Sequence, residues 1–169
     1  MRKCFVLSGF LFVFCLGILA QEAGRNNLPA IELKDIDGKS MNTSNFSNQG
    51  KPFIISFFAT WCKPCLRELS TIHEVYEDWI DETGVKLIAV SIDDTRSSAN
   101  VKTLVNGKGW EYEVFLDPNG AFKRAMNVNN IPHTFIIDGS GKIAWQHTSF
   151  SQGSENEMLE VVKKLMNND

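Results

Sequence analysis

Apolar and polar residues follow one another along the chain in blocks that predict strands and helices in turn. Nearly continuous apolar runs, typical of strands covered on both faces, occupy residues 52–58, 85–92 and 134–137. Apolar residues at helical spacing occupy residues 66–82, 97–106, 121–126 and 155–166. Strands that alternate with helices predict an α/β fold with a central mixed β-sheet flanked by helices.

Two hairpins complete the predicted sheet. Residues 31–35 alternate at period two, and Asp37-Gly38 supplies a turn before residues 40–43, so we expect an N-terminal β-hairpin extension. Residues 142–147 follow the turn at 138–141 and form the partner strand of a second hairpin. Residues 28–169 are therefore predicted to form one domain, preceded by a polar linker at 21–27.

The first 20 residues have the layout of a secretory signal peptide. Arg2 and Lys3 form a basic end, residues 5–19 are almost wholly apolar, and Ala20 precedes polar residues. We expect cleavage after Ala20, because the apolar run is short of the roughly 20 residues of a spanning helix. An uncleaved segment would instead anchor the protein in a membrane.

Export changes the charge and the cysteine count. Removal of Arg2 and Lys3 leaves 15 basic against 20 acidic residues, and this mildly acidic chain without a basic cluster argues against a nucleic-acid partner. Cys4 and Cys15 leave with the signal peptide, so only Cys62 and Cys65 remain. We expect no disulfide framework and no cofactor.

The two remaining cysteines stand in the stretch FFATWCKPCLREL, between a predicted strand and a predicted helix. Unpaired N–H groups at a helix start stabilise a thiolate, so Cys62 is the expected nucleophile and Cys65 the resolving thiol. Pro64 is compatible with a first helical turn. A zinc site would need four ligands, and the three histidines lack paired spacing. The pattern favours a redox pair over a metal site or two inert thiols.

Helix geometry adds a carboxylate to the pair. At about 100° per residue, the apolar residues of 65–82 occupy one arc, and Glu68 falls inside that arc with Cys65. A carboxylate on an apolar face beside a thiol could exchange protons with it. His73 falls near the other edge of the arc and is interpreted as a packing residue.

A second group of interest is Ile131-Pro132-His133-Thr134-Phe135. A proline cannot donate to a sheet ladder, so Pro132 is expected at the start of its strand. From spacing alone, an ordinary trans peptide bond would be favoured.

Together, Trp61-Cys62-Lys63-Pro64-Cys65 and residues 131–135 resemble a thioredoxin-like thiol-disulfide oxidoreductase of the bacterial cell envelope, of the TlpA/ResA type. Glu68, three residues after the second cysteine, and the 33–39 segment are also similar. The resemblance implies a thioredoxin-like fold and a cis Pro132 packed on the cysteine pair. It further implies that Ile131 offers backbone hydrogen bonds to a substrate, and that Glu68 is an active-site residue.

We therefore expect a periplasmic or cell-envelope enzyme that exchanges electrons with protein disulfides, as a reductase. Cys62, Cys65, Glu68 and Pro132 would carry the catalysis, with Trp61, Ile131 and His133 at the substrate. Expected partners are protein thiols and disulfides and a membrane electron donor, and the protein is expected to be a monomer.

Two alternatives from other classes remain open at this point, and peroxidase activity is less favoured than either. A copper-handling module could use Cys62, Cys65 and His133 as ligands. A structural or adhesive envelope domain would not need its thiols. A peroxidase would favour a single reactive cysteine in a Thr-x-x-Cys setting, whereas Cys62 follows Ala59-Thr60-Trp61.

Overall fold

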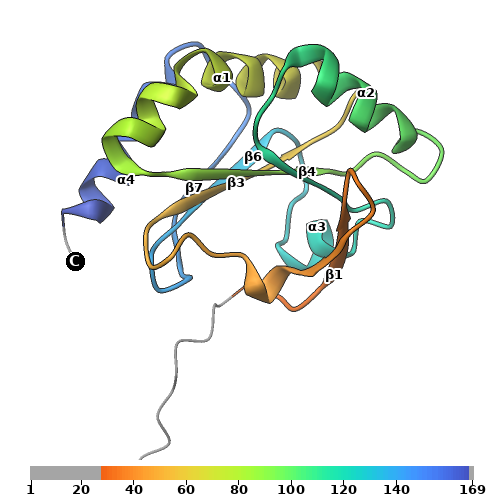
Figure 1. The fold of residues 1–169 in the computed structure, drawn as a ribbon, viewed down its shortest axis with the longest axis horizontal. Coiled ribbons are helices and arrows are strands. Elements are labelled where there is room, and N and C mark those ends of the chain that lie inside the picture. The colour runs from red at the N-terminus through yellow and green to blue at the C-terminus, as the bar shows by residue number, and fades with distance from the viewer. Residues whose placement is uncertain (1–27, 168–169) are drawn as a thin grey trace, which may run out of the picture.

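The computed structural model describes residues 28–167, so the predicted signal peptide at 1–20 and linker at 21–27 lie outside the described residues. Seven strands form one twisted sheet in the order β2-β1-β5-β4-β3-β6-β7 (Figure 1). The strands are β1 (Glu32–Asp35), β2 (Ser40–Asn42), β3 (Phe53–Phe58), β4 (Lys86–Ser91), β5 (Glu113–Leu116), β6 (His133–Ile137) and β7 (Ile143–Thr148). In the described part of the chain, no helix is long and apolar enough to cross a bilayer.

The sheet is mixed, as predicted. β3, β4 and β5 are parallel neighbours, whereas β1, β6 and β7 pair antiparallel to the strands beside them. The two predicted hairpins are present as β1–β2 and β6–β7. The chain thus has the predicted α/β architecture with an N-terminal hairpin at one edge.

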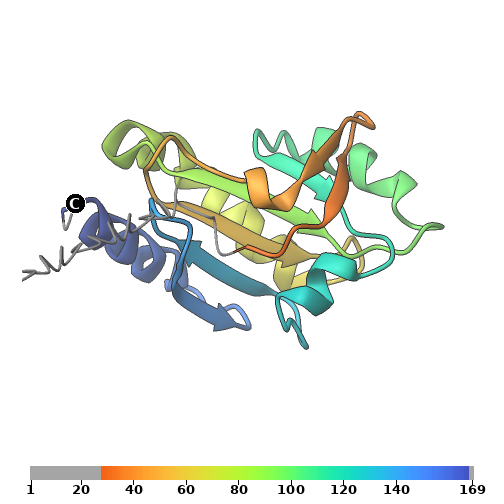
Figure 2. The same cartoon turned by 90° about the horizontal axis from the view of Figure 1, so that it is seen from below.

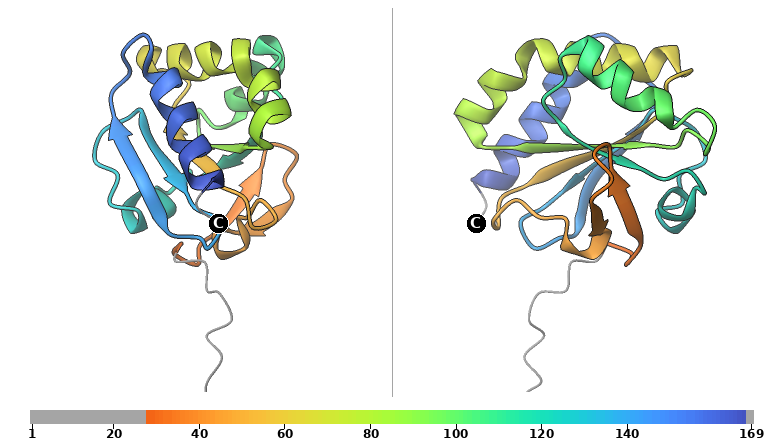
Figure 3. Two further views of the ribbon diagram at one scale, coloured as in Figure 1. Left: turned by 90° about the vertical axis from the view of Figure 1, so that its left-hand side faces the viewer. Right: turned by 45° about the vertical axis from the view of Figure 1, so that its right-hand side comes forward.

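Helices cover both faces of the sheet. The helices are α1 (Lys63–Thr83), α2 (Ala99–Lys108), α3 (Ala121–Ala125) and α4 (Ser154–Met166), with a 3-10 turn, η1 (Thr43–Asn45). α1, α2 and α4 lie on one face, and α3 with η1 lies on the other (Figures 1 and 2). α4 crosses the sheet close to α1 at the β6–β7 side (Figure 3).

β3 divides the core into two halves, because successive side chains of a strand point to opposite faces. Ile54 and Phe58 pack under α1, α2 and α4, whereas Phe53 and Phe57 join the phenylalanine-rich cluster on the α3 side. All six residues of β3 are buried, which explains its continuous apolar run. The one polar residue of the strand, Ser56, faces α1, where it has a specific partner.

One strand was not predicted from the sequence. β5 has only four residues, too few for a clear periodic signal, although Trp110, Tyr112 and Val114 alternate with exposed Glu111 and Glu113. The helix predicted from residue 66 begins at Lys63 and includes Pro64 in its first turn.

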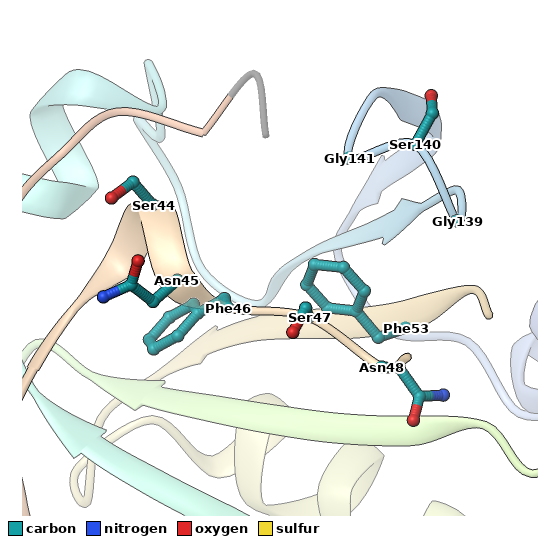
Figure 4. Close-up of a pocket in the computed structure, with 9 residues that line it drawn as sticks. All are labelled: Ser44, Asn45, Phe46, Ser47, Asn48, Phe53, Gly139, Ser140 and Gly141. Atoms are coloured by element: carbon teal, nitrogen blue, oxygen red, sulfur yellow. The ribbon is translucent and has the colours of Figure 1, made fainter. Parts of the chain in front are cut away.

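A shallow hollow of about 320 Å³ lies between the residues after η1 and the β6–β7 turn (Figure 4). Phe53, the first residue of β3, lines it, so the hollow is at the opposite end of β3 from Cys62. The turn approaches the loop before β3 closely at Gly139. A Cβ on Gly139 would lie 1.8 Å from the carbonyl oxygen of Gly50, which leaves room only for glycine.

This contact generates a stability prediction. Gly139→Ala must push the β6–β7 turn away from Gly50, and we expect the free energy of unfolding to fall by about 1–3 kcal/mol, the usual cost of overpacking. Gly107→Ala is the matched control, because its Cβ meets nothing within 4 Å inside α2. The control should be neutral or stabilising by about 1 kcal/mol. Urea unfolding of both variants measures the difference, and equal stabilities would contradict the prediction.

Candidate active site

Cys62 and Cys65 form a disulfide at the N-terminus of α1, with their Cα atoms 5.3 Å apart. Cys62 is the N-cap residue, and its Sγ accepts a hydrogen bond from the Cys65 N–H at 3.3 Å. The helix start therefore points unpaired N–H groups at the sulfur of Cys62, which is the arrangement that stabilises a thiolate.

The two cysteines differ in access. Cys65 is fully buried, Cys62 retains 6% exposure, and the neighbouring Trp61 is 65% exposed. An attacking group from solvent can reach only the sulfur of Cys62 without opening the helix. This asymmetry agrees with the predicted roles of nucleophile and resolving thiol.

Pro132 lies at the same end of the sheet as the disulfide. The antiparallel pairing of Phe57 with His133 brings the residues that follow β3 beside those that precede β6. The Ile131–Pro132 bond is cis, as the family resemblance implies. The carbonyl of Pro132 accepts from the N–H of Ser149 at 3.0 Å. Within residues 28–167, the backbone N–H and carbonyl of half-buried Ile131 have no hydrogen-bond partner.

Glu68 is completely buried on α1, one turn after Cys65, where helix geometry predicted an apolar face. Its Oε1 accepts hydrogen bonds from Ser56 Oγ of β3 at 2.9 Å and from Thr134 Oγ1 of β6 at 2.7 Å. Each donor offsets part of the cost of burying a charge. The Glu68 carboxyl is therefore buried with hydrogen-bond partners on the same helix as Cys65.

The third partner of Glu68, His147, was interpreted in the sequence only as a histidine without a paired metal ligand. Its Nε2 lies 3.3 Å from Glu68 Oε2, although the two residues are 79 positions apart. It reaches Glu68 because His147 of β7 pairs with Thr134 of β6, so both side chains project from the same face of the sheet. Only the register of the β6–β7 hairpin reveals this neighbour.

Asp93 was also missed. It is fully buried just after β4 and accepts hydrogen bonds from the N–H of Thr60 at 2.8 Å and from its hydroxyl at 2.5 Å. Ser91 Oγ donates to the same carboxylate at 2.8 Å. Asp93 thus anchors the loop that carries Trp61 and Cys62. No local sequence pattern links residues that are 33 positions apart.

His133 lies on the other face of the sheet from Glu68, since it precedes Thr134 by one residue. Its ring stacks on Phe135 at 4.4 Å, and Nε2 lies 3.1 Å from Gln146 Oε1. The His133 side chain and Glu68 are therefore on opposite faces of the sheet. Among residues 28–167, no group of three or more histidine, cysteine, aspartate or glutamate side chains could hold a metal ion. Nothing in the described chain supports the copper alternative.

Comparison with known proteins places this arrangement in a family. The model of the AhpC/TSA family matches residues 25–146. The chain belongs to this family. Within it, the chain is 31% identical over 137 residues to the thiol-disulfide oxidoreductase ResA of Bacillus thuringiensis subsp. konkukian, covering 81% of this chain and 75% of that protein. The resemblance to ResA-type proteins is thus confirmed.

Solved structures agree with the thioredoxin-like fold of this AhpC/TSA family member. A thioredoxin-like protein from Porphyromonas gingivalis superposes with a TM-score of 0.76 at 58% identity, over 85% of this chain and 94% of that one. A thiol:disulfide interchange protein of the thioredoxin family from Chlorobium tepidum gives a TM-score of 0.66 at 26% identity, over 86% and 99% of the two chains.

The difference in access predicts a difference in thiol reactivity. In the reduced protein near neutral pH, iodoacetamide should alkylate Cys62 at least about tenfold faster than Cys65. Cys62 is the more exposed of the two, and the helix start stabilises its thiolate. Peptide mass spectrometry after short exposures measures both rates. Equal rates, or faster labelling of Cys65, would reverse the assigned roles.

The loop anchor predicts a loss of stability in Asp93→Asn. The amide removes the negative charge that strengthens the bonds from Thr60 and Ser91, so we expect the free energy of unfolding to fall by about 1–3 kcal/mol. Asp94→Asn is the control, since Asp94 is exposed and bonds only within its own turn. Urea denaturation of oxidised protein distinguishes them. Matching midpoints for the two variants would show that Asp93 does not hold the loop.

Proposed function

We propose that this protein is a thiol–disulfide oxidoreductase that exchanges electrons between its Cys62–Cys65 pair and protein disulfides, working as a reductase in the cell envelope. The observation that carries the proposal is the disulfide at the exposed start of α1, beside a cis proline and above a buried, hydrogen-bonded carboxylate. Membership of the family that contains ResA supports the same activity.

The first step uses the exposed sulfur. In the reduced protein, the Cys62 thiolate attacks one sulfur of a substrate disulfide, forming a mixed disulfide and releasing the other substrate sulfur as a thiolate. The helix N-terminus stabilises the attacking thiolate, and Trp61 forms an exposed apolar surface beside it. At this stage Cys65 is still a reduced thiol, so the transfer of two electrons to the substrate is not complete.

The second step uses the buried sulfur. Cys65 loses its proton to Glu68, and its thiolate attacks Cys62 Sγ, which forms the enzyme disulfide and releases the second substrate thiolate. Glu68 lies three residues after Cys65 on α1, so the two side chains share one face of the helix. The enzyme has then given two electrons to the substrate. The reverse steps would oxidise a dithiol.

Backbone groups near Pro132 suit an extended substrate segment. The N–H and carbonyl of Ile131 lack partners within the described chain, and they border the buried cis proline beside the disulfide. A substrate strand that pairs with Ile131 would bring its disulfide to Cys62 without requiring particular side chains. We therefore assign protein disulfides as substrates. His133 follows Pro132 directly, and its side chain points to the other face of the sheet from Glu68 and is bound to Gln146.

The N-terminal segment supports a location in the cell envelope. Residues 1–20 would export the protein, leaving a domain from residue 28 onward in an oxidising compartment. A reductase there must be re-reduced, so we propose a membrane protein as its electron donor and a monomer as the working form.

Trapping tests the proposed exchange directly. Cys65→Ala removes the resolving thiol, so reduced protein incubated with oxidised insulin should accumulate a mixed disulfide on Cys62 that dithiothreitol reverses. The Cys62→Ala variant is the control and should form little adduct, because Cys65 is buried. Non-reducing electrophoresis with mass spectrometry identifies the linked residue. Absence of a Cys62 adduct, in protein shown to be reduced and folded, would rule out the function.

Glu68→Gln tests the assigned proton acceptor. The amide keeps the shape and can still accept from Ser56 and Thr134, but it cannot take a proton from Cys65. We expect resolution of the mixed disulfide to slow about tenfold, less than the 10²–10⁴-fold typical of general acid–base catalysis, because thiols ionise readily. Cys62 alkylation at fixed pH should change less, and stability should stay level. A wild-type pH–rate profile in Glu68→Gln would leave the carboxylate without a role.

A further inference from the structure

The proton accepted by Glu68 has no direct route to water. Glu68 is completely buried, its Oε1 is held by Ser56 and Thr134, and these hydroxyls are also fully buried. A carboxyl that takes one proton per turnover must return it to solvent before the next cycle. The group that allows this return must touch Glu68 and also reach water.

His147 meets both conditions. Its Nε2 lies 3.3 Å from Glu68 Oε2, the oxygen that the hydroxyls leave free, and its side chain is 17% exposed. His147 also belongs to β7, the edge strand of the sheet, so its ring lies next to solvent. We propose that His147 is a positioning residue that orients Glu68 and carries its proton to and from solvent. This role rests on the proposed thiol–disulfide exchange.

The surroundings of His147 contain few other groups that could serve. From α1, Glu68 is the ionisable side chain bonded to it, while β3 and β6 contribute the hydroxyls around Glu68. On β7 itself, Trp145 packs against the imidazole at 4.8 Å. α4 packs apolar Met158 and Val162 into this half of the core, and its Lys163 pairs with Glu82. His133 points to the opposite face of the sheet, where it is bound to Gln146.

The proton path is then short and balanced. Cys65 gives its proton to Glu68 as the thiolate forms and attacks Cys62. Glu68 Oε2 passes the proton to Nε2 of a neutral His147, and the resulting imidazolium loses it to water at the exposed part of the ring. Imidazole is suited to this task, because its two nitrogens can accept and release a proton near neutral pH. No electrons move in these steps, so the redox chemistry remains that of the cysteines.

A chromogenic disulfide separates the two chemical steps. Reduced protein mixed with dithiobis(nitrobenzoate) releases one nitrothiolate when Cys62 attacks and a second when Cys65 resolves the adduct. In His147→Gln, the glutamine amide can still donate to Glu68 but cannot carry a proton. We expect the first phase to be unchanged and the second to slow about three- to tenfold near neutral pH. The second phase of the variant should also depend on pH differently from that of the wild type.

His73→Gln is the matched control. His73 is a half-buried histidine of α1 on this side of the sheet, but its ring contacts Tyr112 and not Glu68. Its two phases should match the wild type. In His147→Ala, added imidazole should recover part of the second phase, since the position of the ring is partly exposed on the edge strand of the sheet. An unchanged second phase in His147→Gln, or a slowing that is equal at every pH, would overturn the proposal. A wild-type protein with no second phase would instead refute the thiol–disulfide exchange itself.

Discussion

Four elements of the fold meet at the carboxylate of Glu68. α1 supplies the side chain, and β3, β6 and β7 supply its partners Ser56, Thr134 and His147. A buried carboxylate without hydrogen bonds costs several kcal/mol, so these partners fix both the rotation of α1 and its height over the sheet. A change of one residue in the helix register would turn the carboxylate by about 100°, away from these partners. The same constraint places Cys65 beneath the surface and Cys62 at its edge.

Two loops complete the site at one end of the sheet, one after β3 and one before β6. The loop after β3 is fixed by Asp93 through both polar groups of Thr60, and the loop before β6 by the cis bond at Pro132 and the Ser149 hydrogen bond to its carbonyl. These hydrogen bonds hold both loops independently of the covalent bond between the two cysteines.

The sequence predicts the features that repeat with a period and misses those set by long-range register. The apolar run of β3 and the arc of α1 were sufficient to locate the sheet centre, the cysteine pair and buried Glu68. β5 escaped because four residues give no clear period. His147 and Asp93 reach the site only through strand pairing and a loop contact. The face of His133 could have been read from strand alternation, whereas the cis bond at Pro132 came from family resemblance, since spacing favoured trans.

The central claim is that the charge of Glu68 acts on Cys65. The direct measurement is the reduction potential of the Cys62–Cys65 pair against pH, in glutathione buffers, for wild type and Glu68→Gln. A buried negative charge disfavours a thiolate at Cys65, so its removal should stabilise the reduced form increasingly as pH rises and the thiols ionise. The account predicts that the variant becomes the more oxidising protein at high pH and that the two curves converge at low pH. Curves that coincide at every pH would contradict it.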